Sequence, residues 1–275
     1  MKCNKKTWMT VLIALALSQG VALATQRLFT YTYEPEVLPK GALEFEQWVT
    51  WRGGRSADTG QQDYSRWQFR EEFEYGVTDN YTASFYLNTR HQSFTDPAAG
   101  TSTSEFKFDG ISLENRYMVL NPAEHPIGLT LYLEPTYSGE EFELEQKIII
   151  GQRHGKWKWA LNLSHATEWD LRKYEKEGEF EVAFGITRKL GKHWHLGVEL
   201  RNHNELPEYK KWENTAFYLG PVVSYERGDW WATMSVMPQV WGKNTAGGPD
   251  PDGYRGLELE GHERINVRLI VGFGF

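Results

Sequence analysis

The chain has 275 residues, of which 40% are hydrophobic and 15% are aromatic, and its formal net charge is −7 at pH 7. A negative net charge argues against nucleic acid as a partner. The one cysteine, Cys3, excludes a disulfide within the chain and a metal site built from several thiolates. No stretch approaches the roughly 20 apolar residues that a membrane-spanning helix needs, which excludes a helical membrane protein.

The N-terminus has the residue order of a secretory signal. Three lysines precede an apolar run over residues 9–17, and small residues follow up to Ala24. We predict a signal peptide over residues 1–24. Its removal takes away three lysines, no acids and Cys3, so the formal charge falls from −7 to −10. Residues 25–40 are then either a periplasmic N-terminal segment or a plug inserted into the fold.

The first segments of the mature chain alternate apolar and polar residues, as expected of strands with one apolar face. In Gly41–Arg52, the odd-numbered positions are mostly apolar and the even-numbered ones mostly polar. The same pattern fills Asp63–Tyr75 and Tyr81–Arg90, which a tight turn, Gly76–Asn80, connects. Glu71 breaks the pattern because it lies on the apolar face of its segment.

Nine further segments continue the alternation, each with about the 9–11 residues of a tilted membrane strand or slightly more. They are Phe106–Val119, Ile127–Tyr137, Glu141–Gly151, Trp157–Thr167, Gly178–Arg188, His193–His203, Glu213–Tyr225, Trp230–Trp241 and Glu263–Phe275. The total of twelve is even, as bacterial single-chain barrels require. We therefore predict an all-β fold, a transmembrane antiparallel up-and-down β-barrel over residues 41–275.

The connections between these segments alternate in character, as extracellular loops and periplasmic turns do in outer-membrane barrels. The predicted extracellular loops are Gly53–Gln62, His91–Glu105, Ser138–Glu140, Glu168–Glu177, Asn204–Trp212 and Gly242–Gly261. Only Ser138–Glu140 is short. Tryptophans beside both sets of connections fit the two water–lipid boundaries. A soluble β-sandwich is the alternative, but it would leave the apolar face of the last segment without a partner sheet.

The last segment ends on Phe275, and its apolar face includes Val271 and Phe273. It resembles the closing strand of bacterial outer-membrane barrels, which typically ends in Phe and carries the signal read by the barrel-assembly machinery. The wider pattern resembles uncharacterised outer-membrane barrel families, related to phenol-degradation-type transporters. The residues that carry this resemblance are Glu74–Asn80, Asn121–Pro126, Gly220–Tyr225 and Phe275. The resemblance implies a barrel and, loosely, a transport role, with no substrate and no catalytic residue.

Charged side chains predicted to face inward fall into two groups. The basic wall, on the closing strand and the first three strands, comprises Arg52, Arg66, Arg70, Arg90, Arg264 and Arg268. The acidic wall, on the fifth, sixth and eighth strands, comprises Glu134, Glu143, Glu145 and Glu181. Facing each other across the lumen, the two walls would set up a transverse field. Alternatively, these side chains pair with one another and fill the bore.

Catalytic and metal sites find little support in the sequence. Ser164 and His165 are adjacent, so on a strand they point to opposite faces and cannot form a dyad. His91 and Ser93 alternate correctly but lie where a loop begins. On a strand, His193 and His195 would share a face with Glu199, and Asp250–Gly253 resembles part of a calcium loop, yet neither pattern fixes a full ligand set. We predict no enzyme activity, no cofactor and no metal.

We predict a porin-like channel in the bacterial outer membrane, exported by its signal peptide. It would allow passive diffusion of small polar or modestly hydrophobic solutes through a lumen of mixed charge. A closed barrel with a structural or surface-interaction role is the main alternative, and an outer-membrane lipid hydrolase is the third. The expected partners are outer-membrane lipids, lipopolysaccharide and the barrel-assembly machinery. The solute, the oligomeric state, the position of residues 25–40 and the openness of the bore stay undetermined.

Overall fold

A computed structural model describes residues 26–56, 59–209, 211–245 and 256–275. The predicted signal peptide and Asp250–Gly253 lie outside these residues. The strands of the described chain are β1 (Leu43–Gly53), β2 (Gln62–Thr78), β3 (Tyr81–Asp96), β4 (Thr101–Leu120), β5 (Gly128–Tyr137), β6 (Glu141–His154), β7 (Trp157–Asp170), β8 (Glu175–Leu190), β9 (Trp194–Pro207), β10 (Asn214–Arg227), β11 (Trp230–Asn244) and β12 (Ile265–Gly274).

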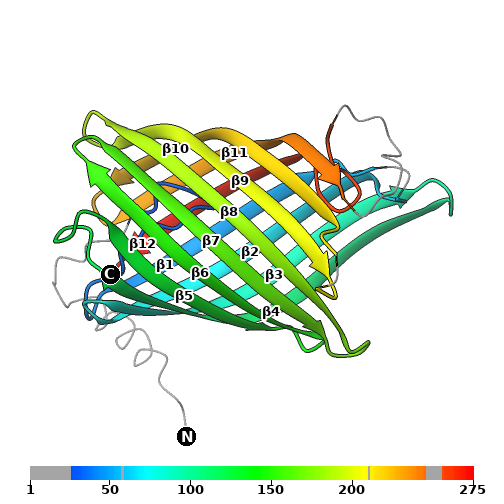
Figure 1. Cartoon of the computed structure of the whole chain (residues 1–275), viewed down its shortest axis with the longest axis horizontal. Helices are drawn as coiled ribbons and strands as arrows, with labels where there is room; N and C mark the ends of the chain where they lie inside the picture. The colour runs from blue at the N-terminus through cyan, green and yellow to red at the C-terminus, as the bar shows by residue number, and fades with distance from the viewer. Residues whose placement is uncertain (1–25, 57–58, 210, 246–255) are drawn as a thin grey trace, which may run out of the picture.

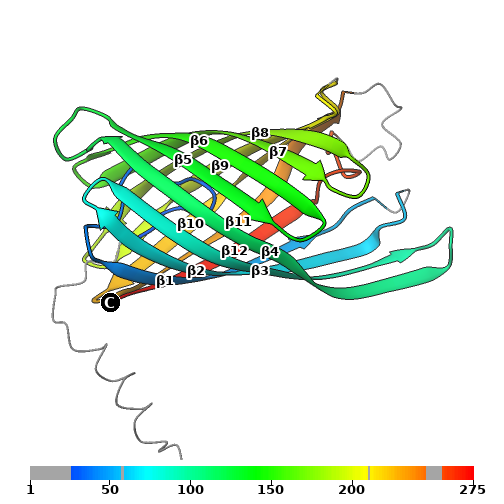
Figure 2. The same ribbon diagram turned by 90° about the horizontal axis from the view of Figure 1, so that it is seen from below.

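The twelve strands form a closed antiparallel barrel in which each strand pairs with its neighbours in sequence (Figures 1 and 2). Closure comes from β1 and β12, which pair from Glu44 opposite Gly274 to Gly53 opposite Ile265. This pairing leaves no free sheet edge, which is the condition for a sheet in lipid. The predicted fold is therefore confirmed.

No helix among the residues that the structure describes is long and apolar enough to cross a membrane.

The alternation along each strand separates an apolar outer face from a polar inner face. In β1, Glu44, Glu46 and Thr50 are buried, whereas Leu43 on the opposite face is 48% exposed. The outward residues that remain exposed around the barrel are mostly large and apolar. A continuous apolar belt of this kind on a closed barrel is the surface that a bilayer covers.

Exposed tryptophans mark the two ends of this belt. The strand β1 begins and the strand β12 finishes on the same side of the barrel, where the short connections also lie. We call this side the turn end and the opposite side the loop end. Trp157, Trp194 and Trp230 are exposed at the turn end, and Trp67 and Trp241 at the loop end. Amphipathic rings at both rims fit two water–lipid boundaries.

Trp231 departs from the expected tryptophan placement. It points inward and is buried, and its indole N–H donates to Glu44 Oε1 at 2.8 Å. Its neighbour in sequence points outward because side chains alternate on a strand.

The hairpin of β3 and β4 is longer than predicted, because it continues through most of the expected loop His91–Glu105. A bulge where Asn88 and Thr89 meet β4 shifts the pairing around Gly110, which has φ of 107°. A side chain on Gly110 would also collide with the carbonyl oxygen of Tyr137 at 2.3 Å. The extra residue in the bulge changes which positions of β4 face outward: even-numbered residues before Gly110 and odd-numbered residues after it. A single alternating pattern therefore cannot describe the whole strand.

Glu71, which breaks the outward apolar pattern, is hydrogen-bonded. The side-chain amide of Gln47 donates to Glu71 Oε1 at 3.1 Å, and the two residues are opposite each other on β1 and β2. A polar residue on the outer face thus has a cross-strand partner.

If a bilayer covers the apolar belt, a charged substitution on the outer face should destabilise the barrel more at the middle of the bilayer than at its surface. Leu163 lies midway along β7 and Leu190 at the turn end of β8, and they are 37% and 39% exposed on the outer face. We expect Leu163→Arg to destabilise the barrel in lipid vesicles by about 2–4 kcal/mol and Leu190→Arg by about 0–1 kcal/mol. Denaturant unfolding followed by tryptophan fluorescence measures both. Equal effects would contradict a membrane-embedded belt.

Candidate functional site

The N-terminal segment, residues 26–40, lies inside the barrel rather than beneath it (Figures 1 and 2). Most of its side chains are buried, including Leu28, Phe29 and Leu38, each at most 1% exposed. The segment contacts strands all around the inner wall, from β3 near Leu38 to β11 near Arg27. It therefore crosses the bore in the half of the barrel nearest the turn end.

A single carboxylate on β9 holds the middle of this segment. Glu199, which is fully buried, accepts hydrogen bonds from the backbone N–H groups of Thr30, Tyr31 and Thr32 at 3.2, 2.7 and 2.6 Å. The Thr30 hydroxyl adds a fourth bond at 3.0 Å. Because the segment is not a strand of the sheet, its buried amides depend on such side-chain acceptors.

Other polar side chains of the wall bind the rest of the segment. Asn162 on β7 accepts from the Tyr33 N–H at 2.6 Å and donates to the Tyr33 carbonyl at 2.9 Å, as a neighbouring strand would. The Thr82 hydroxyl accepts from the Leu38 N–H at 2.9 Å. The wall beneath the segment therefore replaces the hydrogen bonds that sheet pairing would supply.

Inward-facing glycines make room for the segment. A Cβ on Gly185 would lie 2.3 Å from the ring of Phe29, and one on Gly151 would lie 2.9 Å from Pro35. Gly128 also faces Pro35, at 2.7 Å. The wall thus lacks side chains where Phe29 and Pro35 approach it, so wall and segment are complementary in shape at these two positions.

The buried side chain of Arg27 lies near the centre of the bore. Its guanidinium carbon lies 3.9 Å from the ring centre of Tyr33 and 4.4 Å from that of Trp48. Glu46 lies 3.7 Å from it and supplies a counter-charge. A buried cation between two rings and a carboxylate is a stabilising arrangement, and it fills the space that an open pore would need.

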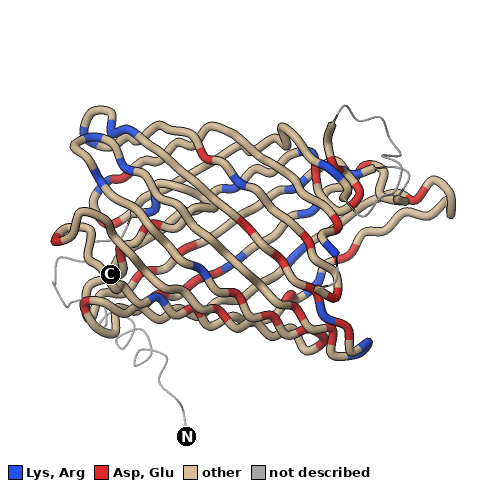
Figure 3. The backbone as a smooth tube through the Cα atoms, in the orientation of Figure 1, with Lys and Arg blue, Asp and Glu red and all other residues tan. Residues whose placement is uncertain are grey.

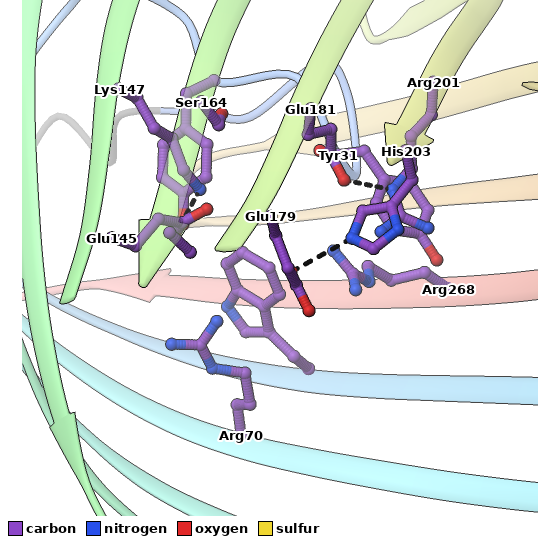
Figure 4. A pocket seen from close by; sticks show the side chains of 13 residues that line it. Tyr31, Arg70, Glu145, Lys147, Ser164, Glu179, Glu181, Arg201, His203 and Arg268 are labelled. Carbon is purple, nitrogen blue, oxygen red and sulfur yellow. Dashed lines mark hydrogen bonds and ion pairs between the residues drawn. The ribbon is translucent and has the colours of Figure 1, made fainter. Parts of the chain in front are cut away.

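Above the segment, the loop-end half of the lumen contains charged cavities. One cavity of about 140 Å³ has Tyr31, Tyr33 and Trp48 among its lining residues, and ion pairs stand on its wall (Figure 4). These pairs are Glu145–Lys147 at 2.8 Å and Glu181–Arg201 at 2.5 Å. Figure 3 shows charged residues along the length of the strands, not only at the barrel rims.

A second cavity, of about 240 Å³, brings predicted residues of both walls together. From the basic wall it is lined by Arg66, Arg70 and Arg90, and from the acidic wall by Glu134, Glu143 and Glu145. The two groups also touch, because Arg70 lies 2.6 Å from Glu134. The cavity thus has a basic side on β2 and β3, an acidic side on β6, and an ion pair between them.

The remaining predicted wall residues are placed differently. Arg52 lies 3.7 Å from Glu263. Arg268 lines the first cavity and donates to the carbonyl of Thr30 at 3.0 Å. Arg264 precedes β12 and is exposed. Glu181 pairs with Arg201 at 2.5 Å in the first cavity, which Arg70 and Arg268 of the basic wall also line.

Several lumen residues were not predicted. Asp109 pairs with Arg90 at 2.8 Å and approaches Arg66 at 3.8 Å. Asp109 faces inward because of the bulge at Gly110. The sequence carries a sign of this bulge, because the large apolar residues change from even-numbered positions (Phe106 and Phe108) to odd-numbered positions (Ile111 and Leu113). Glu179 and His203 also line the first cavity.

The serine and histidine residues that are close together in the sequence do not form a catalytic dyad in the structure. Ser164 faces inward and His165 outward, where His165 contacts the Tyr209 hydroxyl at 3.1 Å. His91 lies 3.1 Å from the hydroxyl of Ser104, not Ser93, on the exposed end of the β3–β4 hairpin. No carboxylate hydrogen-bonds to His91 within the described ranges, so the third group of a triad is missing there.

The side chains of His193, His195 and Glu199 have different surroundings and do not form a metal site. His193 precedes the strand and interacts with the carbonyl of Glu226 at 2.8 Å, while His195 is buried in the strand. Glu199 is occupied by the N-terminal segment.

Comparison with known proteins identifies the family of the chain. The profile of a family of unknown function (DUF6662) matches residues 21–147 and 146–275. The chain belongs to this family. No curated protein sequence matches it.

Two solved structures have a similar fold. A crystal structure of an outer membrane channel from Pseudomonas putida F1 aligns with a TM-score of 0.61 at 12% identity, over 90% of this chain and all of that one. A NanC porin structure aligns with a TM-score of 0.50 at 11% identity, over 84% of this chain and 98% of that one. The likeness shows an outer-membrane type of barrel fold and does not single out the phenol-degradation type.

The role of Glu199 as an anchor predicts a local effect. Hydrogen bonds to charged groups contribute about 1.5–3 kcal/mol each, so Glu199→Ala should loosen the segment without opening the sheet. We expect hydrogen exchange at Thr30, Tyr31 and Thr32 to accelerate by about tenfold or more, measured by mass spectrometry, with unchanged exchange in β1–β12. Glu213→Ala, at the loop end, is the control. Unchanged exchange in the segment would remove this role from Glu199.

Proposed function

We propose that the protein is an outer-membrane channel for small polar solutes, closed at its periplasmic half by a movable N-terminal segment. The turn end is then periplasmic and the loop end extracellular. The observation that carries the proposal is the composition of the wall beneath the segment. A permanently packed core would be expected to be apolar, whereas this wall places hydroxyl, amide and carboxylate groups among apolar residues such as Ile149 and Val222.

The buried polar wall residues that hydrogen-bond to the segment include Thr82, Thr130, Asn162, Glu199, Ser224, Thr233 and Ser235. Each can bind water as well as it binds the segment, so moving the segment would leave polar groups that water can cover beside the apolar wall residues. The segment adds no strand to the sheet and is joined to the barrel through β1. Its departure therefore breaks no sheet pairing.

The solute class follows from the charges of the loop-end cavities. Arginines on β2 and β3 face carboxylates on β6 across the second cavity. Opposite charges across a narrow, low-dielectric passage orient dipolar solutes. We infer that polar or zwitterionic molecules pass more readily than apolar ones of the same size.

We also propose that the C-terminal strand is read during assembly. Val271 and Phe273 point to the outer face, and the Phe275 N–H donates to the carbonyl of Leu43 at 2.8 Å, at the seam where β1 and β12 close the barrel. An apolar, outward motif at the seam suits recognition by the barrel-assembly machinery in the presence of lipid and lipopolysaccharide.

A closed barrel with a structural role is the second candidate. It is favoured by the filled centre of the bore, where Arg27 lies between Tyr33 and Trp48 and where Arg116 bridges Glu74 and Glu114 at 2.5 and 2.6 Å. The two candidates differ in one property, which is whether the bore conducts once the segment is loosened.

Conductance in planar bilayers separates these candidates. We expect the mature protein to give rare or small current steps, and Glu199→Ala combined with Asn162→Ala to give more frequent and larger ones, because the hydrogen bonds to four backbone amides of the segment are lost. Glu213→Ala should behave as the mature protein does. If the double variant shows the mobility shift of a folded barrel on gels and still gives no steps, the closed barrel is correct.

Ion selectivity tests the charged cavity. Arg66→Gln with Arg70→Gln removes two positive charges from one side and leaves the carboxylates of β6 in place. In the loosened channel, the reversal potential under a salt gradient should shift toward cation preference. Arg188→Gln, on the outer face, should cause no shift. An unchanged reversal potential in the double variant would show that these arginines do not face the permeating ions.

A further inference from the structure

Two histidines and a glutamate meet at the loop end of the barrel. His203 and Glu205 lie on β9, and His262 lies in residues 256–264, which precede β12. One potential ligand atom from each residue falls within 4.8 Å of those from the other two. Both histidines are at least nine-tenths buried. The three residues come from separate parts of the chain, so the fold, not local sequence, brings them together.

His203 has the orientation of a metal-binding histidine. Its Nε2 lies 3.1 Å from Oε2 of Glu179 (Figure 4), which leaves Nδ1 as the available ligand atom. This Nδ1 is buried and has no hydrogen-bond partner among the described residues. A carboxylate on one ring nitrogen and a vacant second nitrogen is the usual outer arrangement around a metal-bound histidine.

Glu205 is oriented in the same way. The side-chain amide of Asn214 donates to its Oε2 at 2.5 Å, and its Oε1 lies 4.0 Å from Nδ1 of His262. One carboxylate oxygen is therefore held by a neighbour while the other faces the histidine.

His262 is held in place by its own backbone. Glu258 accepts hydrogen bonds from the N–H groups of Glu260, Gly261 and His262, and Gln239 on β11 binds the carbonyl of Glu258 at 2.7 Å. The Nε2 atom of His262 is buried without a partner within the described part of the chain.

The surrounding charges allow a cation at this position. Glu177, Glu179 and Glu213 flank the three residues on β8 and beside β10. Of the nearby arginines, Arg201 pairs with Glu181 and Arg52 lies 3.7 Å from Glu263, while Arg55 donates to the side chain of Gln61 at 3.1 Å. A divalent cation would add positive charge to a region with an excess of carboxylates.

We propose that His203, Glu205 and His262 bind one divalent transition metal ion of the zinc type. Two imidazoles and a carboxylate suit such an ion better than they suit calcium or magnesium, which prefer oxygen ligands. Zinc–ligand distances of about 2.0–2.2 Å require the three atoms to close to roughly 3.3 Å apart, a shift within reach of side-chain rotation. The bound ion would fasten residues 256–264 to β9 and fix the extracellular mouth.

Isothermal titration of the folded, untagged protein in detergent with Zn²⁺, after removal of metals with a chelator, tests the proposal. We expect one equivalent to bind, with affinity falling on acidification because the imidazoles must release protons. His203→Ala, Glu205→Gln and His262→Ala should each weaken binding by about tenfold or more, and Glu179→Gln by about 10–100-fold. His165→Ala, on the outer face, should leave it unchanged.

Absence of Zn²⁺ binding, or binding that none of these four variants weakens, would overturn the proposal. The mobility shift on gels establishes that each variant is folded. A second readout is the absorption of bound Co²⁺, whose visible bands should appear with the mature protein and with His165→Ala and be lost with His203→Ala. Neither readout requires the barrel to conduct, so the result is independent of the proposed channel function.

Discussion

The constraint on which this lumen depends is the hydrogen bonding of a buried chain segment that belongs to no sheet. Residues 26–40 place backbone groups in the interior of a barrel whose own backbone is already paired. Unsatisfied buried amides are costly, so the inner wall must supply acceptors and donors. Glu199 and Asn162 do so for four of these amides, and the glycines opposite Phe29 and Pro35 provide the space.

This arrangement links stability to function. The polar wall that satisfies the segment is also a wall that water can cover, so the filled and the open bore are both physically acceptable states. The charged cavities at the loop end give the passage a basic and an acidic side, and Tyr31 and Tyr33 of the segment line the first of them. Closure and selectivity would therefore reside in different halves of one barrel.

The barrel could be predicted from the sequence, because the alternation of apolar and polar residues in a strand and the character of a connection are both local properties of the chain. It also placed Arg66, Arg70, Arg90 and Glu134 on the inner face, since strand parity determines their direction. It could not place the N-terminal segment, whose anchors lie more than a hundred residues away in the chain. It missed Asp109 because one bulge reverses parity, and it missed the meeting of His203 with His262 because only barrel closure and an inward loop bring them together.

The central claim, that movement of the N-terminal segment opens the bore, can be tested with a reversible lock. A Cβ on Gly185 would lie 2.7 Å from Cγ of Phe29, so we expect cysteines at these two positions to be within reach of a disulfide. Cys3, within the predicted signal peptide, is the one native cysteine. Bilayer conductance of Phe29→Cys with Gly185→Cys should be absent when oxidised and appear on reduction, while each single variant should be insensitive to redox state. Equal conductance of the oxidised and reduced double variant would contradict the account.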